Sequence, residues 1–468
     1  MKKQITTSIV VAAFAIAVQA SPARADLDAV SRAMGAPDGL QISGAGQFFS
    51  IGQAFRPGLP WPKQNMTRYS RHDDYGAAAS SVDYVLTRGD MLGGGAIPLI
   101  GEVRTTGGVA GEQGWAVVYP VGTAVQAPAT LRQHDLWISP HGIVKAALAD
   151  KAVVQEGAFE ISRPGKFKAR ATVNAQNLVE KVESWIDNPV LGDMPVVTFY
   201  RDYRDYGGVK FPGRILQTAG GYPAFDLVVN DVKPNAGPVA VPTIGPAVND
   251  VTLDKVADGV FFIHGASHHS VAIEMRDHIV LFETPLGDGR TNAAIKAAKE
   301  GIPNKPIRFA TTTHHHFDHS GGLRAAAAEG ATLLVHETAR GYFEQVFNNP
   351  HTLTPDSLSR SGRQAKFETV GDMRVLTDGN RVVEIHVLKN NQHADGFLIG
   401  YLPQEKILIV ADAFSPRAPI TGRPASLNPV TRNLWDNVSR LGLTVETVLP
   451  IHGRLAKVDE LKLEAGAQ

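Results

Sequence analysis

The pattern of hydrophobic and polar positions changes partway along this 468-residue chain. Before about residue 235, short apolar runs such as 114–119 and 195–200 are separated by Gly, Pro and Asn. Runs of this length between turn residues are typical of strands, so the pattern predicts a mainly antiparallel β domain over 26–235. Residues 177–186 differ, because their apolar positions recur three and four residues apart and predict a helix.

Prolines recur among small residues between 231 and 250, which is typical of a stiff linker, and we place that linker at 236–250. Beyond it, strand-like runs alternate with helical patterns, which predicts an α/β domain over 251–468. The expected strands are 259–264, 270–274, 278–283 and 307–312, and the expected helices are 292–299 and 322–329.

Candidate metal ligands gather after the fourth of these strands, where residues 313–322 read Thr-His-His-His-Phe-Asp-His-Ser-Gly-Gly. His314 and His316 lie two positions apart at a strand end, so their side chains are expected to point the same way. Asp318 and His319 follow on the turn and can reach a second ion. Imidazole and carboxylate are ligands that zinc and similar divalent ions accept, so the segment predicts a metal site.

These residues match the pattern T-H-x-H-x-D-H-x-G-G, and the chain resembles the metallo-β-lactamase superfamily from about Val251 onward. The resemblance implies an αββα sandwich, with the metal site along one edge of two packed sheets. His315, between the two strand-end histidines, is expected to point away from the metals and to be structural.

The resemblance also implies a complete ligand set for two ions. His393 would join the two strand-end histidines at the first ion, and His452 would join Asp318 and His319 at the second. Asp412, which ends another apolar run, is expected to bridge the ions. An Asp at this position, in a chain without cysteine, resembles the glyoxalase II, lactonase and phosphodiesterase branches rather than the β-lactamases that use a thiolate ligand.

The expected function follows from the charges. Two divalent ions about 3.5–4 Å apart hold a bridging water and lower its pKa toward neutrality, so hydroxide exists at ordinary pH. Together with the resemblance, this implies an exported metal-dependent hydrolase that cleaves an ester, lactone or related bond, with Asp318 as the catalytic carboxylate. Its expected cofactors are two divalent ions, zinc first, with iron or manganese as alternatives because the same ligands accept all three.

Other segments are candidates for contact with the substrate or the ligands. His268 and His269 lie on a hairpin that would overhang the site in this fold, and a substrate contact and a solvated turn both stay open. Glu283 stands where the superfamily usually has Asp, and we expect it to support a ligand histidine. Residues 340–363 form either a helical lid over the pocket or a surface excursion.

The N-terminus predicts secretion. Two lysines precede an apolar stretch at 5–20 and an A-x-A site at 23–25, so residues 1–25 are expected to be a signal peptide cut after Ala25. The expected location is periplasmic or secreted, with no membrane span after cleavage. Lys+Arg and Asp+Glu number 46 each, which points to neither nucleic acid nor a charged membrane surface. The expected partner is a small-molecule or polymer-derived substrate.

Residues 200–212 resemble the strands of curved sheets in the periplasmic lipoprotein-carrier group. That resemblance implies a concave sheet that docks an apolar ligand or a polymer segment. Trp61, Trp115, Trp137 and Trp185 then line a groove, or lie in the core as large aromatic side chains more often do.

Three other functions stay open on the sequence. The chain is alternatively a periplasmic β-lactamase that hydrolyses an amide, or a persulfide dioxygenase with one iron, for which the ligands of the first ion suffice. In the third alternative it is not catalytic, and the N-terminal domain captures an apolar ligand while the metal domain is a scaffold.

Overall fold

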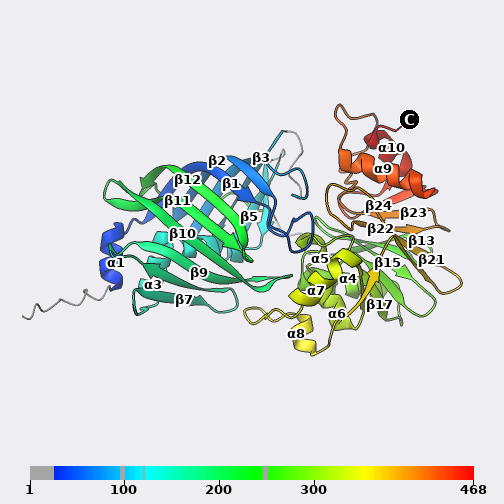
Figure 1. Ribbon diagram of the computed structural model, residues 1–468, viewed down its shortest axis with the longest axis horizontal. Coiled ribbons are helices and arrows are strands. Elements are labelled where there is room, and N and C mark those ends of the chain that lie inside the picture. The colour runs from blue at the N-terminus through cyan, green and yellow to red at the C-terminus, as the bar shows by residue number, and fades with distance from the viewer. Residues whose placement is uncertain (1–25, 95–100, 120–121, 246–250, 468) are drawn as a thin grey trace, which may run out of the picture.

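The computed structural model describes residues 26–94, 101–119, 122–245 and 251–467 (Figure 1). The expected signal peptide, residues 1–25, and residues 246–250 of the expected linker lie outside these ranges. Three sheets account for the strands, one of twelve in the N-terminal part and two of seven and six in the C-terminal part. No helix among the described residues combines the length and the apolar character needed to cross a bilayer.

The N-terminal sheet is a meander in which β1 and β12 also pair, so the strand order is β6-β5-β4-β3-β2-β1-β12-β11-β10-β9-β8-β7. Its strands are β1 (Gly39–Phe49), β2 (Lys63–Asp74), β3 (Ala79–Arg88), β4 (Glu102–Ala110), β5 (Gln113–Val118), β6 (Thr123–Ala127), β7 (Ala158–Arg163), β8 (Phe167–Val173), β9 (Val179–Asn188), β10 (Gly192–Tyr206), β11 (Val209–Ala219) and β12 (Tyr222–Pro234). The expected antiparallel β domain is confirmed.

Three helices supply the partner for the apolar side of this sheet: α1 (Leu27–Met34), α2 (Thr130–Ile138) and α3 (Pro140–Ala149). Their side chains form cores with strand residues such as Phe159, Phe167 and Val182. Trp61 and Trp115, at 5% and 2% exposure, are core residues rather than the lining of an open groove. The chain's own helices thus fill much of the surface that an apolar ligand would otherwise contact.

The helix expected at 177–186 is wrong, because this segment is strand β9 between β8 and β10. Its buried positions alternate, with Val182, Ser184 and Ile186 facing the core. The alternation was not evident in the sequence because Ser184, a polar residue, occupies one of the buried positions. Its hydroxyl lies 2.9 Å from Nε2 of His134 inside the core. Strand pairing therefore outweighed the helical spacing of the apolar residues.

The C-terminal part is a four-layer sandwich, which confirms the expected αββα fold. One sheet contains β13 (Thr252–Ala257), β14 (Val260–His264), β15 (Ser270–Glu274), β16 (Ile279–Phe282), β17 (Ile307–Thr311), β18 (Thr332–His336) and β19 (Lys366–Val370). The other contains β20 (Met373–Thr377), β21 (Val382–Val387), β22 (Leu398–Leu402), β23 (Ile407–Val410), β24 (Thr447–Pro450) and β25 (Ala456–Lys457).

Helices cover both outer faces of the sandwich, as Figure 1 shows. Helices α4 (Asp288–Gly301), α6 (Leu323–Glu329) and α7 (Glu337–Val346) pack on the seven-stranded sheet, and α9 (Pro429–Leu441) and α10 (Val458–Ala465) pack on the other. The helices expected at 292–299 and 322–329 are confirmed as α4 and α6. Gly330 ends α6 at a φ of 95°, a left-handed conformation that glycine adopts without steric cost.

The segment 340–363 contains the end of α7 and the short helix α8 (Ser357–Ser361). Asp193, at the start of β10, accepts hydrogen bonds from the backbone of Thr352 and Leu353. Arg324 of α6 pairs with Asp356. Within the described part of the chain, no hydrogen bond of this segment goes to a candidate metal ligand, which favours a packed connection over a lid.

The two sheets of the sandwich are too close for an added side chain at Gly400 of β22. A Cβ atom there would lie 2.7 Å from Cζ of the fully buried Phe282 on the facing sheet. We expect Gly400→Ala to lower the unfolding free energy of the C-terminal part by about 1–3 kcal/mol, the usual cost of overpacking. Urea denaturation followed by tryptophan fluorescence measures it. Gly422→Ala is the control, since a Cβ there meets no atom within 4 Å; equal loss in both variants would contradict the packing argument.

Candidate metal centre

Every expected metal ligand follows a strand of the sandwich, on a loop or on a short helix at one edge. His314 and His316 follow β17, and α5 (Phe317–Ser320) carries Asp318 and His319. The remaining three come from separate loops, with His393 between β21 and β22, Asp412 after β23 and His452 after β24. Strands β16 and β17 are parallel, and so are β23 and β24, so within each sheet the carboxyl ends of the paired strands lie at the same edge. Most of the ligands follow these ends, in both sheets.

The first group consists of His314, His316 and His393, which are all buried and bring one ring nitrogen each within 4.8 Å of the others. The Nε2 atoms of His314 and His393 are 3.1 Å apart. Three imidazoles that converge in this way match a three-histidine set for one divalent ion.

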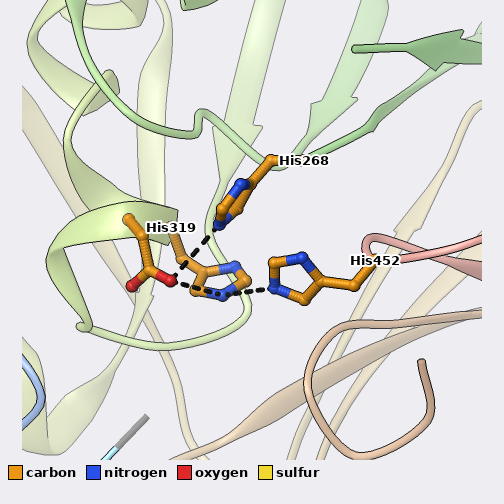
Figure 2. A group of neighbouring side chains, drawn as sticks. His268, His319 and His452 are labelled. Atoms are coloured by element: carbon orange, nitrogen blue, oxygen red, sulfur yellow. Dashed lines mark hydrogen bonds and ion pairs between the residues drawn. The ribbon is translucent and has the colours of Figure 1, made fainter. Parts of the chain in front are cut away.

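The second group consists of Asp318, His319 and His452, and His268 lies within the same 4.8 Å limit. The Nε2 atoms of His319 and His452 are 3.2 Å apart. In Figure 2 the rings of His268, His319 and His452 are directed toward one another from three separate segments.

Asp412 lies between the two groups. Its Oδ2 is 3.6 Å from Nε2 of both His314 and His393, in the first group. The same oxygen is 2.7 Å from Nε2 of His319, and Oδ1 is 3.5 Å from Nε2 of His452. One carboxylate is therefore within reach of both groups, as a bridging ligand requires.

The hydrogen bonds of three histidines determine which ring nitrogen carries the proton. His316 Nε2 faces the Ala54 carbonyl at 3.0 Å, and His452 Nδ1 faces the Ser267 carbonyl at 2.8 Å. His319 Nδ1 faces a carboxylate oxygen of Glu283 at 3.0 Å. Because carbonyl and carboxylate oxygens accept, each of these nitrogens must donate. The other nitrogen of each neutral ring then presents a lone pair to the cluster.

Several nitrogen and oxygen atoms that face the cluster lack a hydrogen-bond donor, which favours a bound cation. Nδ1 of His316 is buried and has no hydrogen-bond partner among the described residues. Oδ2 of Asp412 is close to His319, yet it accepts no hydrogen bond of good geometry. The Nε2 atoms of His319 and His452 face each other at 3.2 Å, so with both rings neutral they repel, and either a proton or a metal ion between them relieves that repulsion. The donor set therefore fits divalent metal ions.

Glu283 contacts His319, the kind of support expected from the sequence. Its other carboxylate oxygen accepts a hydrogen bond from the backbone of Thr313 at 2.6 Å, so one buried side chain holds both the histidine and the metal-binding segment. Its φ of 67° is a conformation that costs free energy in residues with a Cβ, and such strain is typical of functional sites.

The surrounding charges set the protonation of the cluster. Burial alone would lower the pKa of His319, but the carboxylates of Asp412, Asp318 and Glu283 outweigh it and raise that pKa well above its usual value. Burial also opposes ionisation of Asp318, yet His319 and His268 hold the pKa of this carboxyl well below its usual value. The centre is thus a site where positive charge is strongly favoured.

The histidines of the 265–270 loop are both buried at 7% exposure, so the solvated turn considered above is wrong. His268 Nε2 is 3.3 Å from Oδ2 of Asp318, and burial lowers the pKa of His268. His269 instead holds the loop in place, because its Nε2 is 2.7 Å from the Gly453 carbonyl. His268 therefore belongs to the site, whereas His269 positions the loop that carries it.

His315 is turned away from both groups, as expected, and its Nε2 lies 2.7 Å from the Ala54 carbonyl. Gln53 was missed on the sequence, although its side-chain amide donates to Oδ1 of Asp318 at 2.8 Å. The two residues are 265 positions apart, and no motif marks the segment around Gln53.

A family match supports the interpretation of this edge. The family model described as "Metallo-beta-lactamase superfamily" matches residues 266–452. Similar solved structures include DIM-1 metallo-beta-lactamase exposed to ceftazidime, at 17% identity over 47% of this chain and 97% of that one, with a TM-score of 0.36. A metallo-beta-lactamase from Pontibacter korlensis has 19% identity over 47% and 100%, with a TM-score of 0.35. One from Hirschia baltica has 21% identity over 46% and 97%, with a TM-score of 0.34.

No curated protein matches the chain. The family match covers the segment from the loop of His268 to His452 and so includes every expected metal ligand. The C-terminal part of the chain is a metallo-beta-lactamase superfamily domain.

Proposed function

We propose that this protein is an exported hydrolase that uses two divalent metal ions, zinc in the first instance, to cleave an ester, lactone or related bond. The observation that carries the proposal is the pair of facing Nε2 atoms on His319 and His452, 3.2 Å apart, with the carboxylate of Asp412 between them and the first group. A second intact group distinguishes a two-ion centre from one that needs a single iron.

Each ion would have three protein ligands besides the shared carboxylate. His314, His316 and His393 would hold the first ion, Asp318, His319 and His452 would hold the second, and Asp412 would contact both. When bound, such ions polarise a substrate oxygen and lower the pKa of water.

The residues of the chain supply orientation and proton handling at this centre. The pKa of Asp318 is held far below its usual range, so its carboxylate is ionised and available as a metal ligand and as an acceptor that orients a water molecule. His268 donates from Nε2 toward Oδ2 of Asp318, and the same N–H can turn to a substrate oxygen as negative charge develops there.

The choice of ester or lactone over β-lactam rests on the bridging position. Asp412 would supply an oxygen ligand to both ions, and the chain contains no cysteine. This arrangement resembles the glyoxalase II and lactonase branches more than the β-lactamases with a thiolate ligand. Export is proposed from the apolar N-terminal segment and its A-x-A site.

Metal content and activity test the proposal together. We expect two zinc ions per chain by elemental analysis, and chelator-sensitive cleavage within a panel of lactones, aryl esters, thioesters, phosphodiesters and β-lactams. Activity that returns on adding zinc to the chelated protein ties the chemistry to the ions. One iron per chain, with oxygen uptake on a persulfide and no hydrolysis, would overturn the proposal.

Substitution separates ligands from other buried histidines. We expect His316→Ala and Asp412→Ala to lower kcat/KM by at least about a thousandfold, because each removes a ligand and leaves the remaining charges unbalanced. His386→Ala is the control, since this buried histidine is paired with Glu384 on β21, outside both groups. Steady-state kinetics of the three variants decide the point, and equal losses in all three would contradict the ligand assignment.

A further inference from the structure

The loop between β1 and β2, residues 50–62, joins the N-terminal sheet to the metal centre, and we call it the docking loop. We propose that the docking loop completes the metal centre, with Gln53 as a positioning residue that holds Asp318 as a ligand of the second ion. The inference rests on the two-ion centre proposed above and adds a contribution from outside the metallo-beta-lactamase superfamily domain.

Gln53 holds one oxygen of Asp318 and leaves the other for the cluster. Its Nε2 donates to Oδ1 of Asp318 at 2.8 Å. Oδ2 of the same carboxylate is 3.7 Å from Nε2 of His319, within the second group. When one oxygen of a carboxylate is held by a hydrogen bond, the other oxygen keeps a defined orientation. Metal affinity depends on residues that hold the ligands in this way.

The amide of Gln53 is suited to this position because it carries no charge. A lysine here would neutralise Asp318 and compete with the cation, and a carboxylate here would repel the carboxylate of Asp318. A neutral donor orients the ligand and leaves its negative charge for the metal.

The docking loop also contacts the first group, through a backbone carbonyl. The oxygen of Ala54 accepts hydrogen bonds from Nε2 of His315 at 2.7 Å and from Nε2 of His316 at 3.0 Å. The second of these bonds fixes the ring of His316 with its Nδ1 directed at the cluster. Consecutive residues of one loop thus position a ligand of each ion.

The docking loop is anchored on both sides of these contacts. On one side the Gly52 carbonyl accepts from the backbone N–H of Phe317, and Trp61 packs edge-on against the Phe317 ring at 5.5 Å. On the other side the carbonyl of Phe55 accepts from the backbone of Asp395, two residues after His393. The loop therefore spans from the helix that carries Asp318 to the segment that carries His393.

Gly52 allows this close approach. Its φ is 79°, and a Cβ atom would lie 2.4 Å from Cγ of Phe317, closer than atoms can pack. A side chain at this position would move the docking loop away from the metal centre without altering Gln53 itself.

Substitution of Gln53 in the full-length protein tests the proposal by metal affinity. Gln53→Leu removes the donor, and Gln53→Glu keeps the size but places a second carboxylate against Asp318. We expect both to weaken the binding of one of the two zinc ions by about 10–100-fold in dissociation constant, measured by competition with a chromogenic chelator. The cobalt-substituted protein should also lose visible absorption from one of its two ions. Gln41→Leu, an exposed glutamine on β1, is the matched control and should bind as wild type does.

Gly52→Ala tests the loop as a whole and should weaken the same ion with Gln53 unchanged. Gly207→Ala is its control, because Gly207 has a similar φ of 67° and a Cβ there meets no atom within 4 Å. Circular dichroism verifies that each variant is folded. A role in packing alone would spare Gln53→Glu, so wild-type affinity in that variant overturns the proposal. Unchanged affinity in Gln53→Leu also overturns it, and fewer than two ions in the wild type would refute the two-ion centre as well.

Discussion

The metal centre depends on one constraint, which is that acceptor groups hold the outward nitrogens of its histidines. Ser267, Ala54 and Glu283 offer oxygens that only accept, so the outward nitrogens of His452, His316 and His319 donate to them. The opposite nitrogen of each ring then faces the cluster and, in the neutral ring, can bind a cation. With the carboxylates of Asp318 and Asp412 added, the cluster has an excess of electron pairs and negative charge. Bound cations would balance that charge and allow the histidine rings to stay neutral.

These oxygens come from different parts of the fold, so both packed sheets and the N-terminal part contribute to one small site. Glu283 follows β16, Ser267 lies in the β14–β15 loop, and Ala54 belongs to the docking loop of the N-terminal sheet. Strand ends of the sandwich supply the ligands themselves, and buried packing such as that of Phe282 against Gly400 holds the strands in place. The N-terminal domain therefore contributes to the geometry of the centre and is not merely attached to it.

The sequence predicted the parts of this molecule that depend on local pattern. We predicted the motif around His314, the strand ends and the helices α4 and α6, because periodicity, caps and ligand spacing depend on residues close together in the sequence. The helix expected at 177–186 failed because a buried polar residue, Ser184, is satisfied by His134, a contact between distant segments. Gln53 was missed for the same physical reason, since its role arises from the docking of two domains.

The most direct test of the two-ion centre is anomalous diffraction from crystals of the full-length protein, recorded above and below the zinc absorption edge. We expect two peaks per chain, one enclosed by His314, His316 and His393 and the other by His319 and His452, with the carboxylate of Asp412 between them. A single peak within the first group, or two peaks with Asp412 turned away from both, would contradict it.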